Sequence, residues 1–320
     1  MKLQKLTQLL LVLFLTALLA LQFFASYEKR LAEERAFNQL FSLIPNPFNA
    51  VVLEAQTALV MDLDTHTPIY VKHPNQPRPI ASITKLMTAD IALRTIDPEE
   101  IVDITPEALK EEGEYGLKSG QKWKAKDLIA FMLIESSNDA AHALQMHSDA
   151  KQAIAENALT PGRFIDLMNA RGQELNLPTA LFGNPSGLDT KEKTPTAFAS
   201  AKDTVYLLDD TYTNYPDIIG TTKYAKYPLL TQEGKEYIAE NTNDIAELIP
   251  GLLASKTGFT DSAGGNLVIL YQTKQGKRIG VSVLGSSLKG RFADIEALVN
   301  ATNTYLDAIY ASPLKEYYPW

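Results

Sequence analysis

Residues 78–89 read Arg-Pro-Ile-Ala-Ser-Ile-Thr-Lys-Leu-Met-Thr-Ala. After the proline, apolar residues recur every three to four positions, which predicts a helix over residues 82–95. Ser82 and Lys85 lie three positions apart, so their side chains share one face of that helix. Serine needs a neighbouring base to become a nucleophile, and a neutral lysine is such a base. Taken alone, the same pattern also fits a surface helix with serine at its N-cap.

The lysine of this pair must be uncharged to accept a proton, although the ordinary pKa of lysine is about 10.4. Burial and a second nearby cation both lower the pKa of an amine. A candidate for that cation is Lys256, in the tripeptide Lys256-Thr257-Gly258. We expect this tripeptide on an edge strand, where the lysine and threonine bind a carboxylate and Gly258 lets another backbone approach. The alternative is an ordinary exposed strand or turn.

A third polar cluster, Ser136-Ser137-Asn138, interrupts residues 126–149, which otherwise show helical periodicity. Polar side chains in an apolar segment are costly unless they are paired, so the cluster indicates the edge of a cleft. There Ser136 can relay protons and Asn138 can hold a substrate amide. The alternative is a loop between two helices, in which the serines and the asparagine act as caps.

Strand patterns occur near both ends of the body. They cover residues 58–63 and 68–71, a hairpin around the turn 64–66, and residues 267–272 and 279–284. Helical periodicity covers residues 82–95, 126–149, 163–175 and 292–311. We therefore expect a two-lobed α/β fold, in which an antiparallel sheet built from both chain ends carries an inserted all-helical lobe. A cleft between lobe and sheet follows.

Composition excludes several classes of function. The chain has 320 residues, no cysteine and a formal net charge of −8. Without a basic face it is not expected to bind nucleic acid, and without cysteine it has no thiolate chemistry. His142 and His147 are five positions apart, which misaligns them for one metal on a helix. We expect no metal and no cofactor.

The N-terminal segment, residues 1–26, contains an apolar run from Leu9 to Ala25. As a helix the run is about 26 Å long, slightly short of a bilayer core of about 30 Å. We favour a membrane anchor over a cleaved signal peptide, because Phe23 would be a poor fit at the third position before a cut after Ala25. Residues 27–54 are expected to form a stalk or linker helix, or a helix packed on the body, followed by a catalytic domain over 55–312 and a tail over 313–320.

Together the three clusters form a specific pattern. S-x-x-K at Ser82, S-x-N at Ser136 54 residues later, and K-T-G at Lys256 120 residues after that are the signature of penicillin-recognising serine enzymes. The chain resembles the low-molecular-mass penicillin-binding D-alanyl-D-alanine carboxypeptidases over about residues 55–311. Further segments that look like this family are 182–189, Phe-Gly-Asn-Pro-Ser-Gly-Leu-Asp, and 256–260, Lys-Thr-Gly-Phe-Thr.

The resemblance implies a role for each matching residue. Ser82 attacks the carbonyl between two D-alanines of a peptidoglycan stem peptide, and Lys85 is the general base. Ser136 relays protons, Asn138 orients the substrate, and Lys256, Thr257 and Gly258 bind it at its terminal carboxylate. The backbone N–H groups of Ser82 and Phe259 form the oxyanion hole. The resemblance also implies that β-lactams acylate Ser82, and that the enzyme works at the periplasmic face of the cytoplasmic membrane or free in the periplasm.

One departure from the family pattern is His66, which stands where relatives usually have a glycine suited to positive φ. Three alternatives to a carboxypeptidase stay open. The first is an endopeptidase that cuts peptidoglycan cross-links. The second is a class A β-lactamase, disfavoured because the second motif reads Ser136-Ser137-Asn138 and no convincing loop glutamate follows it. The third is a wall-binding protein without activity.

Overall fold

The computed structural model describes the chain over residues 15–16, 18–32, 35, 44–113, 116–156 and 163–316. The chain divides into two units: one is Phe48–Asn303, and the other combines Met1–Pro47 with Thr304–Trp320. In the latter unit residues 18–32 are helical. Among the helices of the described residues, none has the length and apolar content that a bilayer crossing requires. Much of the predicted anchor, and the centre of the predicted stalk helix, lie outside the described residues.

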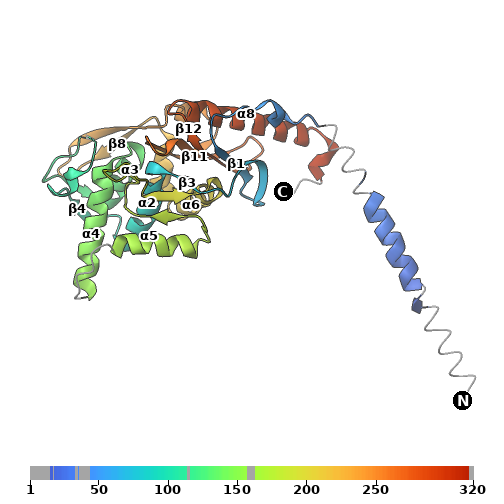
Figure 1. Cartoon of the computed structure of the whole chain (residues 1–320), viewed down its shortest axis with the longest axis horizontal. Coiled ribbons are helices and arrows are strands. Elements are labelled where there is room, and N and C mark those ends of the chain that lie inside the picture. Colours follow the sequence, from blue (N-terminus) through green and yellow to red (C-terminus); the bar gives the residue numbers. More distant parts are fainter. Residues whose placement is uncertain are drawn as a thin grey trace, which may run out of the picture. The chain divides into compact units, whose positions relative to one another are not determined.

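The main sheet has five antiparallel strands in the order β10-β11-β12-β1-β2, of which β1, β11 and β12 are labelled in Figure 1. Their bounds are β1 Thr57–Asp62, β2 Thr67–Lys72, β10 Leu252–Thr260, β11 Gly264–Gln272 and β12 Arg278–Ser286. β1 pairs with β12, which brings Thr57 opposite Leu284. The predicted sheet built from both chain ends is therefore confirmed, and β10, which carries the third motif, is an edge strand.

The inserted part of the chain contains the helices α2 Lys85–Thr95, α3 Ala125–Ile134, α4 Asn138–Glu156, α5 Arg163–Glu174, α6 Ala201–Asn214 and α7 Pro216–Ile219. It also contains short strands in three small sheets: β3 Arg78–Pro79 with β6 Leu181–Phe182 and β7 Ala197–Ala199, β4 Ile101–Asp103 with β5 Lys122–Lys124, and β8 Lys226–Leu230 with β9 Glu236–Glu240. Short 3₁₀ turns are η1 Pro47–Ala50, η2 Ala81–Thr84, η3 Ala108–Lys110, η4 Gly220–Lys223, η5 Ala246–Leu248 and η6 Pro313–Glu316. The last helix is α8, Gly290–Tyr310.

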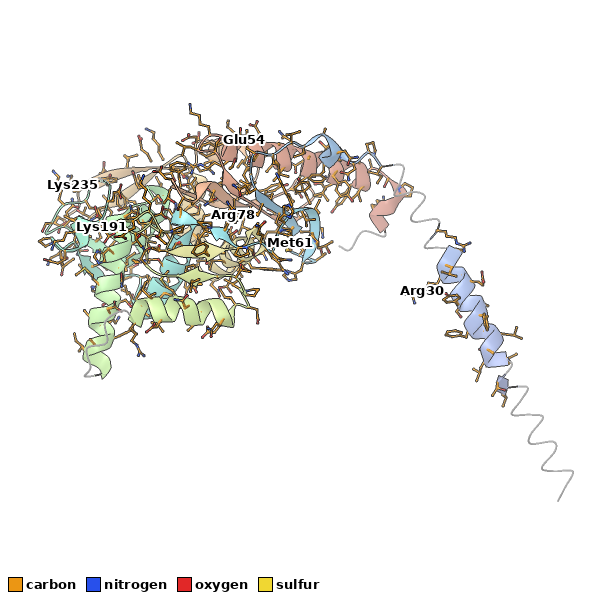
Figure 2. The ribbon with its side chains drawn as sticks, viewed as in Figure 1. Arg30, Glu54, Met61, Arg78, Lys191 and Lys235 are labelled. Atoms are coloured by element: carbon orange, nitrogen blue, oxygen red, sulfur yellow. The ribbon has the colours of Figure 1, made fainter. Side chains whose placement is uncertain are left out.

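The core holds α2 at the centre of the inserted part. Every residue of α2 from Lys85 to Leu93 is buried, and the helix packs against α3, α4, α5 and α6. α6 also covers β11 and β12 of the main sheet. The start of α8 is tied to the strands through Asp294, whose carboxylate accepts from the backbone N–H of Ala55 and from Ser286 Oγ, at 2.8 and 2.7 Å. The same carboxylate accepts from the N–H of Glu54, labelled in Figure 2.

Two details depart from a simple periodic pattern. The stretch 126–149, periodic in sequence, is two helices, because Ser136 between α3 and α4 has a left-handed φ of 61° that no helix continues through. The predicted start of α2 is a 3₁₀ turn, η2, before the α-helix proper. At the turn of the β1–β2 hairpin His66 has φ 54°, so a histidine adopts the conformation for which a glycine is better suited.

Candidate active site

Ser82 and Lys85 lie at the junction of η2 and α2. Lys85 Nζ donates to Ser82 Oγ at 2.8 Å. The residue before the serine, Ala81, has φ 48°, and Thr84 Oγ1 donates to its carbonyl at 2.7 Å. The strained backbone of Ala81 turns the chain from β3 into η2, the 3₁₀ turn that carries Ser82.

Lys85 is held at three points. Besides Ser82, its Nζ donates to Asn138 Oδ1 at 2.7 Å and to the backbone carbonyl of Ser186 at 2.9 Å. The side chain is fully buried, and this burial lowers the pKa of Lys85 to about 7, against the opposing charge of Glu111. A large fraction of the amine is therefore neutral near pH 7, as a general base must be.

Lys256 and Ser136 form a second pair of the same kind. Lys256 Nζ donates to Ser136 Oγ and to the carbonyl of Thr257, both at 2.9 Å. Burial, followed by the charges of Lys85 and Arg291, lowers the pKa of Lys256 well below its ordinary value. The expectation that Lys256 is the cation that lowers the pKa of Lys85 is not supported, because burial accounts for that lowered pKa. An anionic group bound at this site would favour the protonated form of both lysines.

β10 approaches the nucleophile closely at Gly258. A Cβ on Gly258 would lie 2.5 Å from the carbonyl oxygen of Ile80 and 3.2 Å from the backbone nitrogen of Ser82, so only glycine fits. Arg291 Nη1 donates to the carbonyl of Gly258 at 3.0 Å and holds the strand from its other side. The next residue, Phe259, has a side chain that is 42% exposed. The structure thus brings the edge of β10 to the first turn after β3.

The predicted site residues converge. Ser82, Lys85, Ser136, Asn138 and Lys256 are linked by direct hydrogen bonds within two groups, and Gly258 touches the turn that carries Ser82. Thr257 Oγ1 lies 2.6 Å from Thr242 Oγ1, at the end of the β8–β9 hairpin. This arrangement provides a hydroxyl beside an amine that is partly neutral near pH 7, and a second hydroxyl beside a second amine, which lies on β10. Nucleophilic attack on a carbonyl next to a carboxylate is chemistry that it can support.

Sequence reasoning missed several residues of the site. The turn at Ser186 supplies a carbonyl to Lys85, and Gly187 beside it has φ 76° and would place a Cβ 2.0 Å from the carbonyl of Ala81. The local sequence signal for this turn is Asn-Pro-Ser-Gly, residues 184–187, whose residue types are typical of turns. Arg291 and Glu111 had no signal, since each is a single charged residue in a segment without a motif.

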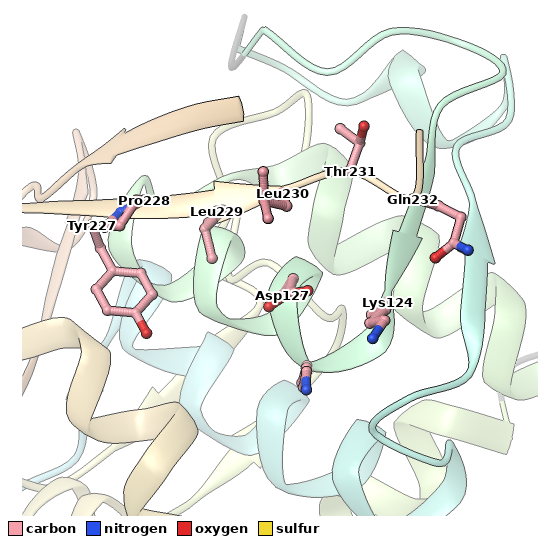
Figure 3. A pocket seen from close by; sticks show the side chains of 9 residues that line it. Lys124, Asp127, Tyr227, Pro228, Leu229, Leu230, Thr231 and Gln232 are labelled. Carbon is pink, nitrogen blue, oxygen red and sulfur yellow. The ribbon is translucent and has the colours of Figure 1, made fainter. Parts of the chain in front are cut away.

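Two surface cavities of the described chain lie away from the three motifs. One of about 500 Å³ lies between the start of α3 and β8, where Asp127 and Tyr227 face it (Figure 3). No residue of the three motifs lines it. The candidate active site is therefore the cluster of hydrogen-bonded motif residues around Ser82, and not this surface cavity. Within the described part of the chain no three metal-ligating side chains gather. His142 and His147 each lie beside a different carboxylate, Glu111 and Glu100.

Comparison with known proteins agrees with this geometry. Residues 46–287 match the family model described as D-alanyl-D-alanine carboxypeptidase. The D-alanyl-D-alanine endopeptidase of Escherichia coli strain K12 is 32% identical over 222 residues, covering 67% of this chain and 66% of that protein. The D-alanyl-D-alanine carboxypeptidase DacF of Bacillus subtilis strain 168 is 26% identical over 255 residues, covering 77% of this chain and 61% of that protein. This chain thus matches less than two thirds of the length of each of these two relatives.

The fold also matches solved structures. Penicillin-binding protein D2 of Listeria monocytogenes, in its cefotaxime-bound form, superimposes with a TM-score of 0.65 at 29% sequence identity. The match covers 78% of this chain and 98% of that one. The predicted two-lobed fold of penicillin-recognising enzymes is confirmed.

Proposed function

Because the chain belongs to the D-alanyl-D-alanine carboxypeptidase family, we propose that it is a serine peptidase that removes the terminal D-alanine from peptidoglycan stem peptides. The observation that carries the proposal is the contact between Lys85 Nζ and Ser82 Oγ, 2.8 Å, in a site where burial lowers the pKa of Lys85 to about 7. A pure wall-binding protein has no need of a buried amine held against a serine by two further acceptors.

In acylation, Ser82 Oγ attacks the carbonyl of the penultimate D-alanine while its proton passes to Lys85 Nζ. The negative charge that develops on the carbonyl oxygen is stabilised by the backbone N–H groups of Ser82 and Phe259. The C–N bond then breaks, and the departing amine of D-alanine takes a proton through Ser136. An acyl-enzyme ester on Ser82 remains, and water hydrolyses it in the second half of the cycle.

The terminal carboxylate of the substrate is bound by Lys256 and Thr257 on β10. In the free enzyme the pKa of Lys256 is lowered by burial and by the neighbouring cations. An incoming carboxylate supplies the missing negative charge and favours the ammonium form, so binding and protonation of Lys256 are coupled. Asn138, which accepts from Lys85, orients the substrate amide on the opposite side. β-Lactams carry a carboxylate at the corresponding place and should acylate Ser82.

Digestion of purified muropeptides tests this function. A monomeric pentapeptide substrate should lose one D-alanine, whereas a Ser82→Ala variant should leave it intact. A second candidate is cleavage of peptidoglycan cross-links, favoured by the 32% identity to the Escherichia coli endopeptidase. A cross-linked dimer in a parallel reaction separates the two: rapid release of monomers with an intact pentapeptide would assign the chain as an endopeptidase instead.

We place the enzyme outside the cytoplasm, where its substrate lies, with residues 1–26 as the anchor and 55–312 as the catalytic domain. The apolar run from Leu9 to Ala25 supports the anchor. Fractionation of cells that produce the full chain should find it in the membrane, and removal of residues 1–26 should release it to the soluble fraction. If cells that express the full-length gene yield a soluble protein that lacks its N-terminal segment, the segment is a cleaved signal.

A further inference from the structure

The charged and titratable groups around Lys85 and the residues next to it come from four places. They are Lys256 on β10, Arg291 on α8, Asp139 and His142 on α4, and Glu111 in the loop after η3. Of these, Glu111 is the acidic group whose charge acts on Lys85 itself. A carboxylate that favours the ammonium form works against the base role of this lysine, so its presence in the site calls for a physical account.

The segment that carries Glu111 is docked on the first turn of α4. The backbone carbonyl of Glu112 accepts from Asn138 Nδ2 at 2.7 Å, and Asn138 Oδ1 in turn accepts from Lys85 Nζ at 2.7 Å. His142 Nδ1 lies 3.3 Å from Glu111 Oε1. Asn138 and His142 are four positions apart on one helix and therefore share a face. The loop, α4 and Lys85 are thus joined in one chain of contacts.

The pair of Glu111 and His142 is only partly open to solvent, with side chains 33% and 28% exposed. Its charge is therefore less screened than that of a surface pair. His142 is positively charged only when it is protonated. A protonated His142 cancels part of the Glu111 charge, and a neutral His142 leaves that charge to act on Lys85. Asp139 beside them is buried, and this burial, followed by the charge of Glu111, raises the pKa of Asp139.

We propose that the charge of Glu111, held in the docked loop beside His142, sets the acidic limit of the pH range in which Ser82 can be acylated. The inference rests on the proposed function, because it concerns the acylation step. The docked loop holds Glu111 in place through the bond between the Glu112 carbonyl and Asn138, and the charge of Glu111 favours the protonated form of Lys85. A positive charge on His142 offsets part of that effect, because its ring lies 3.3 Å from the Glu111 carboxylate.

The test is the pH dependence of acylation by a fluorescent penicillin, measured for the full-length chain from pH 5 to 9. Glu111→Gln removes the charge and keeps the shape, so its acidic limb should move to lower pH by about 0.5–1 unit. At pH 5.5 its acylation should be about three- to eightfold faster than that of the wild type, and at pH 9 it should be unchanged. His142→Gln removes the charge that cancels part of the Glu111 charge, so the acidic limb of its pH profile should move to higher pH. The double variant should follow Glu111→Gln.

Two controls separate this effect from general damage. Glu107→Gln removes the same charge from an exposed residue ahead of η3 that pairs with Lys110, and its profile should match the wild type. Glu111→Asp keeps the charge and should restore a profile close to the wild type. Thermal melts of each variant report the fold.

If the acidic limb of Glu111→Gln does not move, the inference is wrong. It is also wrong if the limbs of Glu111→Gln and His142→Gln move in the same direction, because the loop would then have only a structural role. If Glu107→Gln shifts the limb as far as Glu111→Gln, the effect belongs to net charge and the inference is again wrong. A wild-type chain that no penicillin acylates at any pH overturns the proposed function as well. Acylation of the wild type with no shift in Glu111→Gln overturns the inference alone.

Discussion

Lys256 Nζ lies 2.9 Å from Ser136 Oγ, although 120 residues of chain separate the two. The pair repeats, on the opposite side of the site, the contact between Lys85 and Ser82. Both lysines are buried, and burial lowers the pKa of each, to about 7 for Lys85 and well below the ordinary value for Lys256. In the proposed mechanism the first motif supplies the attack, and the second and third together return a proton to the leaving group.

Replacing Lys85 with methionine should slow acylation of Ser82 by about 10²–10⁴-fold, because the proton of the attacking hydroxyl loses its acceptor. The matched control is Lys193→Met, at a lysine with a 75% exposed side chain that pairs with Asp261 on the surface. Stopped-flow measurement of penicillin binding gives both rates. Equal rates for the two variants would remove lysine from the base role.

The acylation rate of the wild type should rise with pH through about 7. Burial lowers the pKa of Lys85 to about 7, and only the neutral form of the amine accepts a proton. The amine is thus mostly charged and inactive below that pH, and mostly neutral and active above it. Rates measured with one β-lactam in buffers of constant ionic strength test this. A rate that stays constant from pH 5.5 to 9 would contradict the assignment of Lys85 as the base.

Gly258→Ala should impair the site without a large loss of the helices. The added methyl group would meet the carbonyl of Ile80 at 2.5 Å, so β10 must move away from the turn that carries Ser82. Such overpacking typically costs about 1–3 kcal/mol of stability, and acylation should fall at least about tenfold because Phe259, whose N–H is proposed as an oxyanion donor, follows on the same strand.

Gly172→Ala is the control for that change. Gly172 lies in α5, and a Cβ there would meet only side-chain atoms, the nearest at 3.7 Å, which is ordinary contact. Alanine is favoured over glycine inside a helix by about 1 kcal/mol, so this variant should melt at or above the wild-type temperature and acylate normally. If Gly258→Ala also acylated and melted like the wild type, the close approach of β10 to the turn that carries Ser82 would not be needed for activity.

The sequence was most informative where residue types are chemically unusual. Three short motifs, each ambiguous alone, identified the residues that meet at the site, because a serine and a lysine three positions apart have few reasons to recur with S-x-N and K-T-G in that order. Strand patterns at both ends of the body were enough to predict the main sheet, since short apolar runs bounded by turn residues are typical of strands buried on both faces, as β1 and β11 are. The roles of the individual residues stay a prediction.

The sequence was least informative where one backbone angle or one lone charge decides the structure. The break at Ser136 was ambiguous because helical periodicity continues on both sides of a residue that is serine rather than glycine, although φ there is 61°. The β8–β9 hairpin was missed because Pro228 lies inside its first strand. Arg291 approaches Gly258 only through tertiary folding, which no local pattern records. The anchor and stalk remain predictions, since much of residues 1–43 lies outside the described chain.

The most direct test of the account is mass spectrometry of the protein after treatment with benzylpenicillin, followed by peptide mapping. We predict one adduct of the mass of the intact drug, located on Ser82, and no adduct in a Ser82→Ala variant. An adduct on any other residue, or none on the folded wild-type protein, would contradict the assignment of Ser82 as the nucleophile and with it the proposed function.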